Sequence, residues 1–241
     1  MALYKFNIFK NYEDKISHAI TSREIGTLSI SASKEEGKKN RVLLSGKLGF
    51  EEEKTIYMNQ IHSKEVKIIN KNHDYQTILS CDGVVTNQKQ TPLTVMVADC
   101  IPILFFDPIN NAVGAVHAGR AGVFKNIIKE TIESFNSEFK TNAKDLLVGI
   151  GPSIGSCCYE VGKEIADEAI VLGLDYAISL KNGRYFLDNA KIAKKQLSEC
   201  GIKKENIEEL GFCTGCNTDK FYSYRKENQK TGRFAGVIFL K

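Results

Sequence analysis

The sequence lacks the features of a membrane-spanning, exported or nucleic-acid-binding protein. No stretch of its 241 residues approaches the ~18 consecutive apolar residues of a membrane helix. Its start, MALYKFNIFKNYEDK, has no apolar run after a basic segment, so it does not have the pattern of a signal peptide. The net charge of +4 comes from scattered lysines rather than a block, which gives weak support for an anionic small ligand and little for nucleic acid. We therefore expect a cytoplasmic protein that acts on a small molecule.

Neither an internal repeat nor a Pro- or Ser-rich linker divides the sequence, and its length is ample for one hydrophobic core. Strands and helices alternate irregularly, often with strand pairs between helices, which favours mixed sheets over a doubly wound parallel sheet. We predict a single α/β domain over residues 1–241, with mixed β-sheets packed between helices. Its expected elements include a loop over 29–40, a helix over 41–48 capped by Asn40, and an amphipathic helix over 123–139.

Seven cysteines, an odd number in a chain without an export pattern, predict reduced thiols rather than a disulfide framework. Cys213 and Cys216 have the spacing of a zinc knuckle or a redox pair, but no second such pair accompanies them, which favours a structural pair of thiols. Cys157 and Cys158 are adjacent, which is poor geometry for two ligands of one metal. The GIGPSIG segment before them is neither a phosphate-binding nor a dinucleotide motif.

The stretch from residue 93 to 123 carries the strongest chemical signal. Two apolar runs, 101–106 and 112–116, flank an Asp107-Pro108 turn opening, which predicts a β-hairpin. If the turn centres near Pro108 and Ile109, partner numbers sum to about 217, which sets Cys100 opposite His117 with Cβ atoms roughly 4.5–5.5 Å apart. Such a pair can share a metal ion or a proton, although a buried Cys beside a core His is the plain alternative. The AGRAG segment that follows lets the backbone approach a group closely.

A third ligand-type residue, His62, follows an apolar strand in the same way as His117. One Cys and two His would leave the fourth position of a tetrahedral zinc open to water or substrate, as in catalytic sites. His73 lies in a polar segment typical of a surface loop.

Five ordered motifs resemble the polyphenol oxidase (laccase-domain) family: QIHSKEV, VADCIPILFFDP, VGAVHAGRAGV, GIGPSIGSCCYEVG and CTGCNTDKFYSYRKENQKTGRFAGVI. The match is collinear over nearly the whole chain. Members of that family are regarded chiefly as zinc-dependent purine nucleoside phosphorylases, with adenosine deaminase activity also attributed to them. The resemblance thus implies Zn²⁺ as cofactor, and phosphate and a purine nucleoside of the adenosine, inosine or methylthioadenosine class as substrates.

By position, the resemblance places the family's zinc ligands on His62, Cys100 and His117. Asn40 and Arg41 resemble the family's NR pair, which lies near the substrate pocket.

The family's HAGWRG is HAGRAG here, with Arg120 in place of Trp and Ala121 in place of the usual Arg. Either Arg120 reaches the same anion from one position away, or that contact is lost. Arg41, Arg120 and Arg225 are the candidates for phosphate. Asp99 is the candidate proton shuttle, or else it orients a ligating His.

Three alternatives stay open. Cys100 with His117 as its base would suit a hydrolase or amidase, for instance on a peptidoglycan precursor. The aromatic and basic run 221–226 suggests an RNA-binding module, but no basic cluster elsewhere supports it. A copper polyphenol oxidase would need several copper ions, for which one three-ligand site is too little.

Overall fold

The computed structural model describes residues 3–29 and 34–241. Its largest sheet has the strand order β14-β10-β8-β9-β6-β4, and a four-stranded sheet has the order β1-β2-β15-β7. The strands of the larger sheet are β4 (Val66–Ile69), β6 (Gly83–Thr86), β8 (Ile101–Asp107), β9 (Ala112–Ala118), β10 (Leu147–Ile150) and β14 (Ile207–Glu209). Those of the smaller one are β1 (Leu3–Tyr4), β2 (Ile16–Thr21), β7 (Leu93–Val97) and β15 (Phe234–Leu240).

Side chains of β8 alternate between two hydrophobic clusters, as the two-residue period of a strand requires. Ile103 and Phe105 pack towards the helices. Leu104 and Phe106 pack towards the four-stranded sheet. The larger sheet is therefore buried on both faces, which explains why every residue of β8 and β9 is buried.

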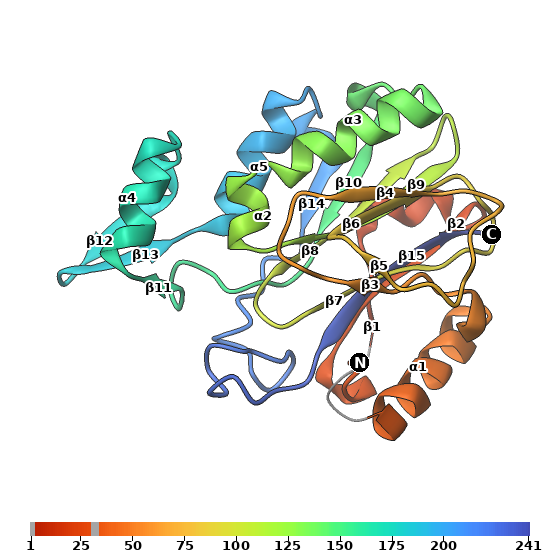
Figure 1. Ribbon diagram of the computed structural model, residues 1–241, viewed down its shortest axis with the longest axis horizontal. Coiled ribbons are helices and arrows are strands. Elements are labelled where there is room, and N and C mark those ends of the chain that lie inside the picture. The colour runs from red at the N-terminus through yellow and green to blue at the C-terminus, as the bar shows by residue number, and fades with distance from the viewer. Residues whose placement is uncertain (1–2, 30–33) are drawn as a thin grey trace.

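Helices cover the outer faces of the two sheets (Figure 1). On one side of the larger sheet lie α2 (Arg120–Phe124), α3 (Ile127–Phe139) and α5 (Asn189–Glu199), and α1 (Lys34–Leu48) lies beside the four-stranded sheet. At one end, α4 (Lys163–Val171) stands with a small sheet of β11 (Glu160–Val161), β12 (Ile178–Lys181) and β13 (Arg184–Leu187). The remaining pair is β3 (Met58–Asn59) and β5 (Leu79–Ser80), and the 3-10 helices are η1 (Asn7–Tyr12), η2 (Arg23–Ile25), η3 (Glu52–Lys54), η4 (Ala143–Asp145), η5 (Asp175–Ala177) and η6 (Lys204–Asn206).

This arrangement confirms the predicted α/β class with mixed sheets packed between helices, because parallel and antiparallel pairs occur in one sheet. Over the described residues, no helix has both the length and the apolar character needed to cross a membrane.

The predicted hairpin forms from β8 and β9, but its register is wrong by two. Asp107 pairs with Ala112, so the turn holds four residues, and Pro102 rather than Cys100 stands opposite His117. The carboxylate of Asp107 accepts the N–H groups of Ile109 and Asn110, which moves the centre of the turn one residue along the chain.

Two predicted helix boundaries are also wrong. Helix α1 begins at Lys34, inside the predicted loop, because the Lys- and Glu-rich segment before Asn40 favours helix despite its polarity; residues 30–33 of that loop lie outside the described chain. The predicted helix 123–139 is two helices, because Asn126 adopts φ 60° and caps the second by accepting the N–H of Lys129.

Candidate functional site

Three ligand-type side chains converge where β8 and β9 leave the larger sheet. His117 lies on β9, Cys100 directly precedes β8, and His62 follows β3 in a loop where its own φ is +57°. Cys100 Sγ is 4.0 Å from His62 Nε2, and the two imidazole rings are 4.8 Å apart. The three ligand atoms all lie within 4.8 Å of one another. The three residues predicted from the sequence therefore do lie together. The predicted reason, a β8–β9 register with Cys100 opposite His117, is not the one that the structure has.

Asp82, which sequence reasoning missed, holds this group in place. Its fully buried carboxylate accepts a hydrogen bond from His117 Nδ1 at 2.8 Å. It also accepts hydrogen bonds from three successive backbone N–H groups, those of Ile61, His62 and Ser63, at 3.3, 3.1 and 2.6 Å. A fifth bond comes from the Ser63 hydroxyl. The carboxylate thus fixes the left-handed backbone of His62 and turns Nε2 of His117 towards the other ligands. The only signal in the sequence was an Asp beside Gly83 in a turn.

Gly119 is the small residue that lets the three ligands approach. A Cβ at this position would lie 3.0 Å from Cys100 Sγ and 3.1 Å from His62 Cδ2, closer than ordinary van der Waals contact. The expectation that the AGRAG segment allows a close approach is confirmed here.

The two central groups favour a thiolate beside an imidazolium. Burial disfavours the charged form of Cys100, but the charge and hydrogen bond of His117, aided by His62, lower its pKa to about 6. Burial likewise works against the charged His117, yet Cys100 and Asp82 raise its pKa to about 9. A divalent cation would replace the proton that the two groups share, since metal ligands must be a deprotonated thiol and a neutral imidazole. This donor set of two nitrogens and one sulfur fits Zn²⁺.

A cavity of about 770 Å³ opens beside the ligands. Three arginines line it: Arg120, Arg225 and Arg233. Other parts of the wall are less polar and are formed by Tyr159, Met58 and Met96. Arg120 pairs with Glu168 of α4 at 2.9 Å. Arg225 donates to the backbone carbonyl of Glu160 at 2.6 Å and lies over the ring of Tyr159.

The third arginine, Arg233, was missed in the sequence. It lies over the ring of Tyr224 and donates to two backbone carbonyls of its own turn. Arg233 lies inside the fifth motif, but nothing in its sequence context besides its residue type indicated an anion.

Asp99 lines the same cavity, with φ at +84°. Its carboxylate accepts the hydroxyls of Thr214 and Ser223 at 2.6 and 2.8 Å and the backbone N–H of Arg225 at 2.7 Å. Asp99 therefore ties the segment that carries Arg225 to the ligand Cys100. The carboxylate that orients a histidine is Asp82.

Asn40 and Arg41 lie on α1, outside the set of described residues that line the cavity. Asn40 Nδ2 donates to the carbonyl of Thr27 at 2.9 Å, and Arg41 pairs with Glu52 and donates to the carbonyls of Leu28 and Ser29. Since Ser29 lines the cavity, Arg41 contacts the cavity wall through the Ser29 carbonyl, whereas Asn40 bonds to Thr27, which does not line it.

A second group of ligand-type side chains corrects the interpretation of the remaining thiols. Cys213 and Cys216 are not alone, because Cys157 and Cys158 join them with all four sulfurs within 4.8 Å of one another. The adjacent pair is thus compatible with one centre, since the chain turns tightly at Gly155, whose carbonyl accepts the N–H of Cys158.

Comparisons with known proteins agree over nearly the whole chain. The model of a family described as multi-copper polyphenol oxidoreductase laccase matches residues 16–241. A purine nucleoside phosphorylase of Clostridium acetobutylicum is 34% identical over 99% of this chain and 97% of its own length. The purine nucleoside phosphorylase YlmD of Bacillus subtilis is 30% identical over 84% of this chain and 77% of its own. A mouse purine nucleoside phosphorylase is 31% identical over 95% of this chain, which spans 56% of that longer protein.

Two solved structures share the fold. The hypothetical protein YfiH of Bacillus licheniformis matches with a TM-score of 0.91 and 25% identity, covering 100% of this chain and 97% of that one. The protein YlmD of Geobacillus stearothermophilus gives a TM-score of 0.89 at 24% identity and the same coverage.

Proposed function

The chain belongs to the multi-copper polyphenol oxidoreductase laccase family, and on that premise we propose that it is a cytoplasmic, zinc-dependent purine nucleoside phosphorylase. The observation that carries this proposal is the placing of two histidines and a thiol against a cavity lined by arginines. Cavities of roughly 300–1,000 Å³ suit small molecules such as a nucleoside. Relatives named purine nucleoside phosphorylase at 30–34% identity support the same substrates, a purine nucleoside and phosphate.

His62, Cys100 and His117 would hold the zinc ion. The ion would supply Lewis acidity beside the substrate, and three protein ligands are the number found in catalytic zinc sites. A multi-copper oxidase fits less well, because the described residues offer one centre containing histidines and one made only of cysteines.

The reaction requires phosphate to attack C1′ of the ribose, so that the bond to the base breaks and ribose 1-phosphate forms. We assign the anion to the arginines on the cavity wall. Arg120 is the first candidate, since a guanidinium holds phosphate with two parallel hydrogen bonds. Its pairing with Glu168 aligns it but also means that phosphate competes with a carboxylate. Arg225, presented by Asp99, is the candidate for contact with the nucleoside.

Arg41 supports the cavity wall through Ser29, and Asn40 bonds to Thr27 nearby. Arg41 as a group that acts on the anion and Asn40 as a group near the substrate stay predictions. A proton carried by Asp99 to the departing base also stays a prediction; its place on the cavity wall favours it.

A second candidate is a hydrolase that uses Cys100 as nucleophile. The lowered pKa of the Cys100 thiol, which His117 causes against the effect of burial, is the observation that favours it. Metal content separates the two, because a thiolate bound to zinc is blocked as a nucleophile. Adenosine deamination would use the same zinc site without phosphate.

The test is phosphate-dependent cleavage of inosine and adenosine by the protein purified without chelator. His62→Ala and His117→Ala are expected to lose the metal ion of this centre and the activity together, whereas His73→Ala, which lies outside the cavity lining, keeps both. Arg120→Lys is expected to raise the KM for phosphate about ten- to a hundred-fold, the worth of one charge-assisted pair, with zinc unchanged. Activity that does not depend on phosphate would contradict the proposal, and an equal loss of deamination in Arg120→Lys would contradict the phosphate assignment.

A further inference from the structure

Four cysteines from two loops meet at one edge of the larger sheet. Strands β10 and β14 are parallel neighbours, so the loops that follow them leave the sheet at the same edge. The two loops then pair with each other: the N–H of Ser153 donates to the carbonyl of Phe212 at 3.2 Å, and that of Thr214 donates to the carbonyl of Ser153 at 3.0 Å. This pairing brings the Cys157-Cys158 dipeptide against the Cys213–Cys216 turn.

The distances between the sulfur atoms fit a single ion. Cys216 Sγ lies 3.5 Å from Cys157 Sγ and 3.4 Å from Cys158 Sγ, and all four sulfurs fall within 4.8 Å of one another. Four sulfurs at about 2.3 Å from a tetrahedral zinc stand about 3.8 Å apart. A disulfide needs about 2.05 Å, and an iron–sulfur cluster places several atoms between the cysteines, so neither matches the spacing.

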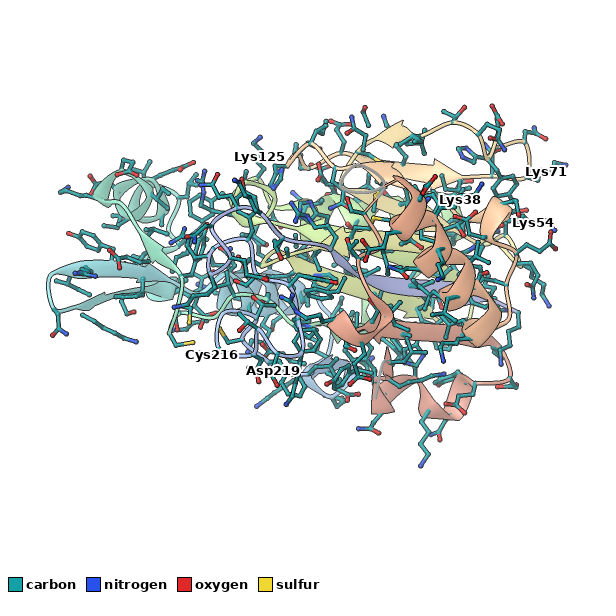
Figure 2. All side chains as sticks on the ribbon, turned by 90° about the horizontal axis from the view of Figure 1, so that it is seen from below. Lys38, Lys54, Lys71, Lys125, Cys216 and Asp219 are labelled. Atoms are coloured by element: carbon teal, nitrogen blue, oxygen red, sulfur yellow. The ribbon has the colours of Figure 1, made fainter. Side chains whose placement is uncertain are left out.

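The backbone is shaped around these sulfurs. The N–H of Gly155 donates to Cys213 Sγ at 3.2 Å, and the N–H of Cys216 donates to the carbonyl of Cys213 to close the turn. A Cβ at Gly215 would lie 2.9 Å from Cys158 Cβ and 3.1 Å from its Sγ. Only glycine therefore lets Cys158 reach the turn. Cys157 and Cys216 are exposed, and Figure 2 shows Cys216 on the outside of the molecule, where a metal ion has access.

We propose that Cys157, Cys158, Cys213 and Cys216 bind one zinc ion as a closed tetrathiolate site, separate from the His62–Cys100–His117 centre. Four protein ligands leave no open position, so the site is structural rather than catalytic.

The bound ion would clamp two parts of the cavity wall. The first loop continues into Tyr159, and the second continues into Tyr224 and Arg225, all of which line the cavity. Within the second loop, the hydroxyl of Thr214 donates to Asp99, which also lines the cavity. Zinc binding at the four cysteines would thus hold these parts of the cavity wall together, whatever reaction the protein catalyses.

The experiment counts zinc per chain in protein purified under reducing conditions without chelator. We expect two ions in the parent, one in Cys213→Ser/Cys216→Ser, and one in His62→Ala/His117→Ala. Cys200→Ser, a cysteine outside both groups, is the matched control and keeps two. A Cd²⁺ titration of zinc-depleted protein adds a measurement that leaves the four cysteines intact. In Cys100→Ser, which lacks the thiolate of the other centre, the thiolate-to-cadmium absorption is expected to have the intensity of a four-sulfur site.

The proposal is overturned if Cys213→Ser/Cys216→Ser keeps the zinc content of the parent, or if the Cd²⁺ absorption corresponds to fewer than four thiolates. Peptide mapping that finds Cys216 in a disulfide in the native protein, or iron in place of zinc, also overturns it. Failure of the proposed phosphorylase site would appear instead in the His62→Ala/His117→Ala count and in the assays, which leaves the two ideas separable.

Discussion

Asp82→Asn is the substitution that most directly tests how the histidine and cysteine centre is held. The carboxylate accepts five hydrogen bonds, two on Oδ1, from His62 N and His117 Nδ1, and three on Oδ2, from Ile61 N, Ser63 N and the Ser63 hydroxyl. An amide replaces one acceptor oxygen with a donor. An NH₂ group in the place of Oδ1 faces two donors that the carboxylate had satisfied, and one in the place of Oδ2 faces three.

The less disruptive orientation keeps the three bonds from Ile61 and Ser63, gives up the bond from His62 N–H, and turns the NH₂ group towards His117. Nδ1 of His117 must then accept, so the ring proton moves to Nε2, the nitrogen that faces the other ligands. A protonated Nε2 has no lone pair for a metal. Loss of an orienting group of this kind costs about 10- to 100-fold in metal affinity, or about 1.4–2.8 kcal/mol.

The assay is competition for Zn²⁺ with a chromogenic chelator, in the Cys213→Ser/Cys216→Ser background so that the four-cysteine group does not contribute. Ser63→Ala is the control, because it removes one of the five bonds and leaves the tautomer of His117 alone; its affinity is expected to stay within a few-fold of the parent. An affinity of Asp82→Asn within twofold of the parent would refute this reasoning.

Two further predictions concern the close packing around Gly119 and the burial of His18. Gly119→Ala adds a methyl group 3.0 Å from Cys100 Sγ, so we expect reduced zinc content and activity with little change in melting temperature; unchanged zinc content would mean that the ligands shift without cost. His18 accepts the N–H of Phe6, and burial, with a smaller effect of Lys5, lowers its pKa from 6.5 to about 3. The unfolded chain therefore takes up a proton below pH 6.5 that the native chain refuses, and stability falls as the pH drops towards 3, by about 1.4 kcal/mol per pH unit. Urea unfolding at pH 5.5 and 4.5 is expected to show this extra loss in the parent relative to His18→Gln, whose amide still accepts the bond; parallel losses would show that His18 is not the cause.

The candidate metal ligands His62, Cys100 and His117 could be selected from the sequence because each lies beside a predicted apolar strand. The reason given for the approach of Cys100 and His117 was nevertheless wrong. Cys100 lies just before the start of β8, where the positive φ of Asp99 turns the chain. Its approach to His117 therefore depends on a local backbone conformation and on the absence of a side chain at Gly119. Cross-strand pairing, the rule available from the pattern, does not describe such a corner.

Asp82 and the four-cysteine group could not be found in the same way. The role of Asp82 depends on a loop that folds over it, and nothing local to its own turn indicates that loop. The two cysteine pairs meet because β14 joins β10 in parallel, a long-range pairing that the intervening helices make possible and that no periodicity encodes. The α/β class, by contrast, followed from the alternation of patterns along the chain.

The position of β15 in the four-stranded sheet has a consequence for how the protein is made. This last strand lies between β2 and β7 and pairs with both. Its Ala235 is joined to Thr21 across 214 positions of sequence. During synthesis, β2 and β7 lack their common partner until β15, which comes more than 130 positions after β7, has left the ribosome. Unpaired strand edges associate with other chains, and contacts of such long range form slowly. The pairing of β15 thus protects both strands, and the nascent chain is exposed to aggregation at these strands until β15 joins them.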